Sequence, residues 1–212
     1  FARTAEGWTV RAAHPADHRK LVEALAEEGG VPSIAVQLWA IADATAQGTI
    51  GALVLADALG RAGTEVGLLA ATRGAAEVSG GEAVDASKAA LLGAAAVARM
   101  EIPAVAARVV DVVVPASEAE ARAMGARIAA EALAGEERAV ALRGRHRWVR
   151  GFDAVAPAPV AAPVLREGGV YLFVGGLRGR NERLAEHLVR TRGAKLALLD
   201  PTLPHRGHWD AV

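Results

Sequence analysis

A glycine-rich turn joins an apolar segment to a helical segment late in the chain. Gly169–Phe173 predicts a strand, Glu182–Arg192 predicts a helix, and between them stands Val174-Gly175-Gly176-Leu177-Arg178-Gly179-Arg180-Asn181. Strand, glycine turn and helix in this order begin a dinucleotide-binding βαβ unit, in which glycines let the backbone approach a pyrophosphate. The candidate cofactor-binding residues are therefore Gly175, Gly176, Leu177 and Gly179.

Other residues of the turn argue against a working nucleotide site. In the pattern T-G-x-x-x-G-x-G, Val174 replaces the threonine and Asn181 replaces the third glycine. Asn181 brings a Cβ to a position where close backbone contact is needed. We therefore expect the four candidates to be vestigial. Arg178 and Arg180 would still attract a phosphate, so retained dinucleotide binding remains the alternative.

Further chemistry finds little support in the sequence. His14 and His18 are four residues apart on a predicted helix, but no third metal ligand is implied, and we expect no metal site. None of the four serines stands in a G-x-S-x-G pattern, so hydrolysis is not expected. We expect Ser117 to cap a helix and the four tryptophans to fill the core. No catalytic residue is predicted.

Composition narrows the class of protein. Of the 212 residues, 24 are Lys or Arg and 24 are Asp or Glu, with no basic block, which argues against a nucleic-acid partner. The absence of cysteine excludes disulfides and thiolate zinc sites. Charged residues interrupt every apolar run before it reaches transmembrane length, so no membrane partner is expected. Hydrophobic residues make up 52% of the chain, which indicates a folded core.

Predicted strands and helices alternate along the chain, which favours an α/β fold with a mainly parallel sheet. We expect the segment Ile34–Trp39 to be a buried strand and the helix Asp85–Met100 to be buried between layers. The other predicted strands are Gly7–Arg11, Glu65–Thr72 and Val105–Val114; the other helices are His14–Glu28, Thr49–Gly60 and Ser117–Ala134; and Ala139–Arg143 with Arg147–Phe152 forms a hairpin.

A proline- and alanine-rich segment divides the chain. Ala154–Pro163 has no helical period and predicts a stiff, extended linker. We therefore predict a first domain over residues 1–153, a linker over 154–168 and a βαβ unit over 169–212. That unit consists of strand Gly169–Val174, helix Glu182–Arg192 and strand Ala194–Leu199.

In order and spacing, six segments resemble the ketoreductase region of modular type I polyketide synthases. The first four resemble its structural subdomain, a truncated Rossmann-like relative without cofactor, and the last two resemble the start of its catalytic subdomain. The segments are VQLW (36–39), AATRGA (70–75), LLGAAAVA (91–98), VALRGRHRWV (140–149), YLFVGGL (171–177) and PTLPHR (201–206) with Trp209 and Asp210.

The resemblance also shows what this chain lacks. The family's active site uses Ser, Tyr and Lys beyond the position of Val212, and the only tyrosine, Tyr171, lies in a predicted first strand. The family places an arginine for the NADPH 2′-phosphate at the end of the second strand, where this chain has Asp200. An acid there would repel that phosphate, or bind a ribose diol as in NAD sites. We therefore expect no cofactor.

These observations lead to one hypothesis and two alternatives. We expect a non-catalytic, structural domain of a cytoplasmic bacterial polyketide synthase, a pseudo-ketoreductase. Its partners would be neighbouring domains, and an acyl carrier protein is a further candidate. The first alternative is the N-terminal part of an active reductase of β-ketoacyl thioesters, in which case NADPH is the cofactor. The second is an independent interaction or dimerisation module.

Overall fold

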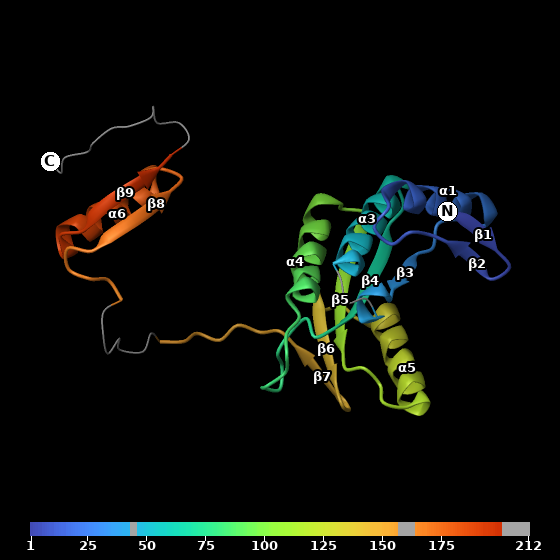
Figure 1. The fold of residues 1–212 in the computed structure, drawn as a ribbon. Coiled ribbons are helices and arrows are strands. Elements are labelled where there is room, and N and C mark those ends of the chain that lie inside the picture. The colour runs from blue at the N-terminus through green and yellow to red at the C-terminus, as the bar shows by residue number, and fades with distance from the viewer. Residues whose placement is uncertain (43–45, 157–163, 201–212) are drawn as a thin grey trace. The chain divides into compact units, whose positions relative to one another are not determined.

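The computed structural model describes residues 1–42, 46–156 and 164–200. The chain forms two compact units, Phe1–Phe152 and Asp153–Val212, each with its own core (Figure 1). Segment 201–206, Trp209 and the proline-rich middle of the predicted linker lie outside the described residues. No helix in the described part is long and apolar enough to cross a membrane.

A five-stranded sheet in the order β3-β4-β5-β6-β7 forms the centre of the first unit. Strands β4 and β5, in the interior of the sheet, are long runs rich in Val, Leu and Ala that are covered on both faces, as is usual for parallel strands. β3 to β6 are parallel, and β7 turns back antiparallel to β6. The strands are β3 (Ile34–Gln37), β4 (Val66–Arg73), β5 (Val105–Val112), β6 (Ala139–Arg143) and β7 (His146–Val149). The predicted α/β fold with a mainly parallel sheet is confirmed.

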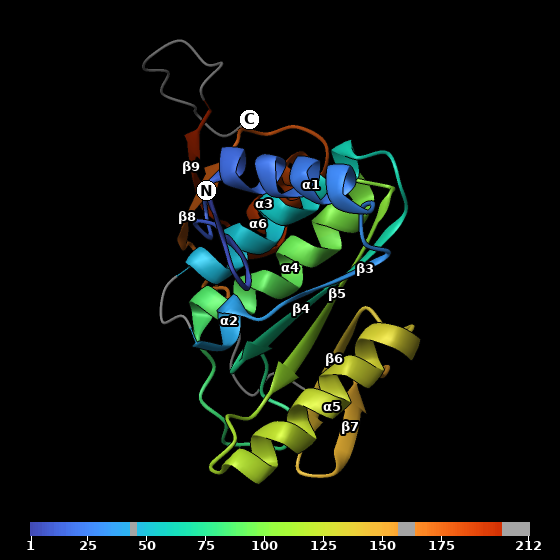
Figure 2. The ribbon, with the colours of Figure 1, turned by 90° about the vertical axis from the view of Figure 1, so that its right-hand side faces the viewer.

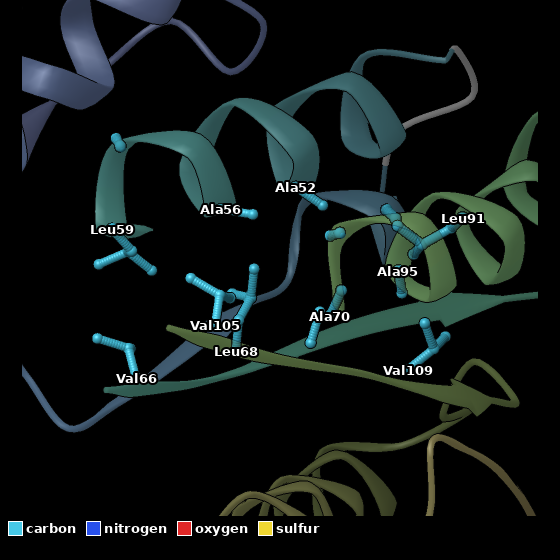
Figure 3. Packing of buried hydrophobic residues seen from close by; sticks show 14 of the residues in the cluster. Ala52, Ala56, Leu59, Val66, Leu68, Ala70, Leu91, Ala95, Val105 and Val109 are labelled. Atoms are coloured by element: carbon cyan, nitrogen blue, oxygen red, sulfur yellow. The ribbon is translucent and has the colours of Figure 1, made fainter. Parts of the chain in front are cut away.

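Helices cover both faces of this sheet (Figure 2). α3 and α4 pack on the face that carries Leu68 and Val109, where alanines let the helices approach closely (Figure 3). α5 packs on the opposite face, against Leu69 and Val110. The helices are α1 (Pro15–Glu28), α2 (Trp39–Ala42), α3 (Gln47–Arg61), α4 (Ala86–Glu101) and α5 (Glu118–Ala134), and β1 (Ala2–Thr4) and β2 (Gly7–Thr9) form a separate hairpin.

The connections between the parallel strands do not all have the same hand. Both β4–α4–β5 and β5–α5–β6 step in the same direction along the sheet, but α4 and α5 lie on opposite faces. Two such crossovers must have opposite hands. The β3–α3–β4 crossover has its helix on the same face as α4 and therefore the same hand as β4–α4–β5. Because nearly all crossovers are right-handed, we assign that hand to these two, and the crossover through α5 is then left-handed.

The predicted cap at Ser117 is confirmed, and Asp85, the first residue of another predicted helix, also acts as a cap. The Asp85 side chain accepts a hydrogen bond from the backbone N–H of Ser87 at the start of α4. The Ser117 side chain accepts one from the N–H of Glu120 at the start of α5. The Glu120 carboxylate reaches back one residue further than a capping box requires, to the N–H of Ala116.

Three expectations about burial are wrong. β3 ends at Gln37 and Trp39 begins a helix; because β3 is an edge strand, Val36 is 43% exposed. α4 is not enclosed between layers, because only one side packs, and Met100 is 80% exposed. The tryptophans do not fill the core: Trp148 lies exposed on β7, Trp8 and Trp39 are half-buried, and Trp209 lies outside the described residues.

The second unit is the predicted βαβ. β8 (Val170–Val174) and β9 (Lys195–Leu199) pair in parallel, and α6 (Arg180–Arg192) connects them. α6 buries Ala185 and Leu188 against Phe173 of β8. Gly193, in the left-handed conformation at φ +57°, ends the helix.

Arg108 ties α5 to the sheet. It is a β5 residue, only 8% exposed, and its guanidinium donates to the carbonyls of Glu131 at 2.7 Å and Ala132 at 2.8 Å, and to that of Gly135. These carbonyls belong to the last turn of α5 and its cap, where a positive charge also offsets the helix dipole. One side chain thus satisfies three carbonyls at the carboxyl end of α5.

We expect Arg108→Met to lower the free energy of unfolding by about 2–4 kcal/mol, because three carbonyls lose a charged donor in a buried place. Urea unfolding followed by circular dichroism measures this. Arg122→Met is the control, because the ion pair of Arg122 with Glu118 is solvent-exposed and should contribute little. Equal losses in the two variants would contradict the role of Arg108.

Candidate functional site

Charged side chains meet at the carboxyl ends of β5 and β6, beside the loop that follows β4. Asp111, at 2% exposure, accepts from Nη2 of Arg143 at 2.6 Å and from the backbone N–H of Ala75 at 3.0 Å. The Nε of Arg143 donates to Glu82 at 2.5 Å. The same guanidinium donates to the carbonyls of Ala76 and Asp111, each at 3.1 Å. Strand β6 therefore supplies one arginine that joins β5 to the loop after β4.

Glu82 closes that loop over the end of the sheet. Its carboxylate also accepts the backbone N–H of Val78 at 2.5 Å and that of Ser79 at 2.8 Å. These bonds, first that from Val78 and then that from Arg143, lower the pKa of Glu82 to about 2. Burial lowers the pKa of Arg143, but the hydrogen bonds that Arg143 donates to Asp111 and Glu82 outweigh burial, and the pKa is raised. Both partners are therefore held in their charged forms.

The carboxyl end of a parallel sheet is where α/β proteins usually bind ligands, in the crevice where the strand order reverses. Here the order runs from β3 to β7 without reversal, and loop 74–85 with its ion pairs fills the end of the sheet. A cavity between α3, α4 and β4 has about 10 Å³, room for one water at most. The first unit thus uses its ligand-binding edge for its own structure.

The structure brings the candidate residues of the second unit together in one turn. Gly175 and Gly176 have φ +98° and +76°, and Gly179 has φ +59°, all in the range that favours glycine. The N–H of Gly175 donates to the carbonyl of Leu199 at 2.8 Å, which ties the turn to β9. Leu177 packs against the core of the unit. The predicted strand–turn–helix geometry is confirmed.

Two polar side chains lie on this turn. The amide of Asn181 donates to the carbonyl of Gly176 at 3.0 Å, so its side chain braces the turn. Asp200, directly after β9, lies against Gly176: a Cβ built there would come within 2.7 Å of Cγ of Asp200 and closer still to Oδ2. Arg178 and Arg180 are exposed at the rim. The sequence singled out these residues, and the structure places Asp200 beside the glycines.

The remaining candidates have structural roles. The Tyr171 hydroxyl accepts from the N–H of Arg166 at 2.7 Å. His18 is fully buried, with Nε2 at 2.8 Å from the carbonyl of Ala12 and its ring edge-on to Trp39. His14 lies beside Asp17. Among the described residues there is no group of three His, Asp or Glu side chains that could hold a metal ion.

Comparison with known proteins identifies the relatives of this chain. It is 36% identical over 154 residues to erythronolide synthase EryA3 of Saccharopolyspora erythraea, covering 71% of this chain and 5% of that protein. It is 37% identical over 117 residues to polyketide synthase ThaG of Burkholderia thailandensis, covering 55% of this chain and 2% of that protein. The chain thus spans only a small fraction of either relative. No family model matches it.

A solved structure gives the same result. The first ketoreductase of the tylosin polyketide synthase superposes with a TM-score of 0.66 at 26% identity, over 90% of this chain and 41% of that one. The homologues are polyketide synthase modules and ketoreductases, and the chain covers part of a ketoreductase region. The resemblance inferred from the six segments is confirmed.

We expect Arg143→Met to lower the free energy of unfolding by about 3–5 kcal/mol, because the buried Asp111 would lose its oppositely charged partner. Chemical denaturation at neutral pH measures this loss. Arg145→Met, at the exposed turn of the same hairpin, is the matched control. If both variants unfold at the same denaturant concentration as the wild type, the ion pairs do not hold the end of the sheet.

The lowered pKa of Glu82 predicts a specific pH dependence. Its contribution to stability is fully present above the ordinary value of 4.5 and is lost as the pH falls toward about 2, because the unfolded chain takes up the proton first. The difference in unfolding free energy between the wild type and Glu82→Gln should therefore be constant near neutrality and shrink in acid. A difference that does not change with pH would show that the Glu82 carboxylate is not held in its charged form.

Proposed function

We propose that this ketoreductase-like domain of a polyketide synthase has a structural, non-catalytic role in its multienzyme. One observation supports the proposal above the others: at both places where a nucleotide-binding fold takes its ligand, the chain has placed its own polar side chains. In the first unit these are Asp111, Arg143 and Glu82; in the second they are Asn181 and Asp200.

The turn of the second unit fits NADPH poorly. The glycines have the required conformation, but the carboxylate of Asp200 lies against Gly176, where a phosphate would need attraction. The side-chain amide of Asn181 donates a hydrogen bond to the Gly176 carbonyl, and the side chain adds bulk at the third glycine position. We therefore assign no step of a reduction to this chain.

A catalytic role for Tyr171 also lacks support. The active site of the family that this chain resembles includes a tyrosine, but Tyr171 is half-buried in β8 and its hydroxyl is bonded to the backbone of Arg166. This bond closes the turn that leads into β8. The residue is thus accounted for by the structure of the second unit.

Neighbouring parts of the multienzyme are the proposed partners. α6 covers one face of the β8–β9 sheet, while Val170, Leu172 and Val174 on the other face are 65–71% exposed. Parallel sheets normally have both faces covered. The exposed apolar face therefore favours contact with another part of the synthase over an isolated existence.

The runner-up is an active NADPH-dependent reductase of β-ketoacyl thioesters. The observation in its favour is the intact strand–turn–helix of the second unit, with three glycines at positive φ. In that case the parent module would act on a substrate carried by an acyl carrier protein.

We expect the parent polypeptide to consume no NADPH when it is given a β-ketoacyl thioester, while deletion of residues 1–152 destabilises or misplaces adjacent domains. Absorbance at the nicotinamide band measures the first effect, and limited proteolysis of the parent measures the second. The matched control is an active ketoreductase assayed with the same substrate. Thioester-dependent NADPH oxidation would establish the runner-up, and normal folding and turnover after the deletion would contradict the structural role.

A further inference from the structure

A row of polar side chains crosses the sheet of the first unit at the carboxyl ends of its parallel strands. We call it the polar row, and it consists of Gln37 on β3, Thr72 on β4, Asp111 on β5 and Arg143 on β6. Thr72 and Asp111 are register partners, and Gln37 pairs with Ala70, two residues before Thr72. Because alternate residues of a strand share a face, the polar row stands on the same side of the sheet as Ala70, which is the side of α3 and α4 (Figure 3).

The two halves of the polar row differ in how their hydrogen bonds are used. Asp111 and Arg143 bind each other and the backbone of loop 74–85. In the other half, Nε2 of Gln37 donates to the carbonyl of Gly48 at 2.9 Å, which fixes the orientation of the amide. Gln37 is 3% exposed and Thr72 is fully buried. Within the described part of the chain, neither Oε1 of Gln37 nor the hydroxyl of Thr72 has a hydrogen-bond partner. Two such oxygens are costly to bury unpaired, so they indicate a ligand.

The surroundings decide which kind of ligand fits these two oxygens. Oε1 of Gln37 can only accept, so the ligand must donate a hydrogen bond, which an anion cannot do. A cation is disfavoured, because α3 and α4 begin at this end of the sheet with the positive ends of their dipoles, and the buried Lys88 lies in the first turn of α4. The hydroxyl of Thr72 can donate or accept. Water is the small neutral molecule that meets all of these conditions.

We propose that the polar row binds an internal water, which donates to Oε1 of Gln37 and bonds with the hydroxyl of Thr72. Internal waters typically make about three hydrogen bonds to buried polar groups that have no other partner. This water continues the bonding of Asp111 and Arg143 across to β3, an edge strand with only one neighbour in the sheet. The inference does not depend on the proposed function, because it holds whether or not the parent enzyme reduces a substrate.

The test counts the long-lived internal waters of the full chain by oxygen-17 magnetic relaxation dispersion. Thr72→Val removes the hydroxyl and keeps the shape of the side chain. Thr49→Val is the matched control, because it removes a buried hydroxyl that donates directly to the carbonyl of Ser87 at 3.0 Å. We expect one water fewer in Thr72→Val than in the wild type and an unchanged number in Thr49→Val. Both variants should unfold at a lower urea concentration than the wild type, because each loses a buried hydrogen bond.

An unchanged number of waters in Thr72→Val, with a folded chain by circular dichroism, would overturn the inference. An equal or higher urea midpoint of this variant would do the same, because valine would then have removed a hydroxyl that was buried without a partner. If Thr72→Val does not fold, a high-resolution crystal structure of the wild type decides. Density for a water within hydrogen-bonding distance of both oxygens supports the inference, and protein groups packed against both oxygens with no water between them overturn it.

Discussion

The bond network of Arg143 is the interaction on which the first unit depends. Bringing a guanidinium and a carboxylate out of water costs several kcal/mol, and the pair persists only because nearly every donor and acceptor is used. Each oxygen of Asp111 accepts a hydrogen bond from within the unit, one from Ala75 and one from Arg143. The network therefore ties loop 74–85 to the ends of β5 and β6.

In each unit a carboxylate lies at the carboxyl end of a parallel strand. The carboxyl end of a parallel sheet, next to the start of a helix, is a place of positive potential that favours an anion. In the first unit Asp111 at the end of β5 is that anion, and in the second it is Asp200 after β9. A side chain costs less to hold in place than a free ligand, because it has no translational freedom to lose.

Local chemistry made much of the fold predictable. Asp85 and Ser117 predict helix starts because their side chains accept hydrogen bonds from backbone N–H groups within three residues. The glycine turn predicts the βαβ unit because its residue types also depend on local backbone conformation. Features that depend on distant residues were missed. Nothing near Arg143 in the sequence indicates that it pairs with Glu82, 61 residues earlier, or with Asp111. Val36 is exposed because its strand, β3, lies at the edge of the sheet, which the composition of the strand does not reveal. At the candidate site, the sequence supplied Asp200 and Asn181, but only the fold shows that both side chains meet Gly176.

Small residues explain how so few aromatic side chains build a rigid unit. Gly48 packs directly on Ala40, where a Cβ would approach the backbone to 2.7 Å, and the cores between α3, α4 and the sheet are mostly alanine, valine and leucine. Close packing of this kind leaves a cavity of only about 10 Å³ between α3, α4 and β4. A unit with a filled ligand edge, a closed loop and a tightly packed interior has little left that can move on binding.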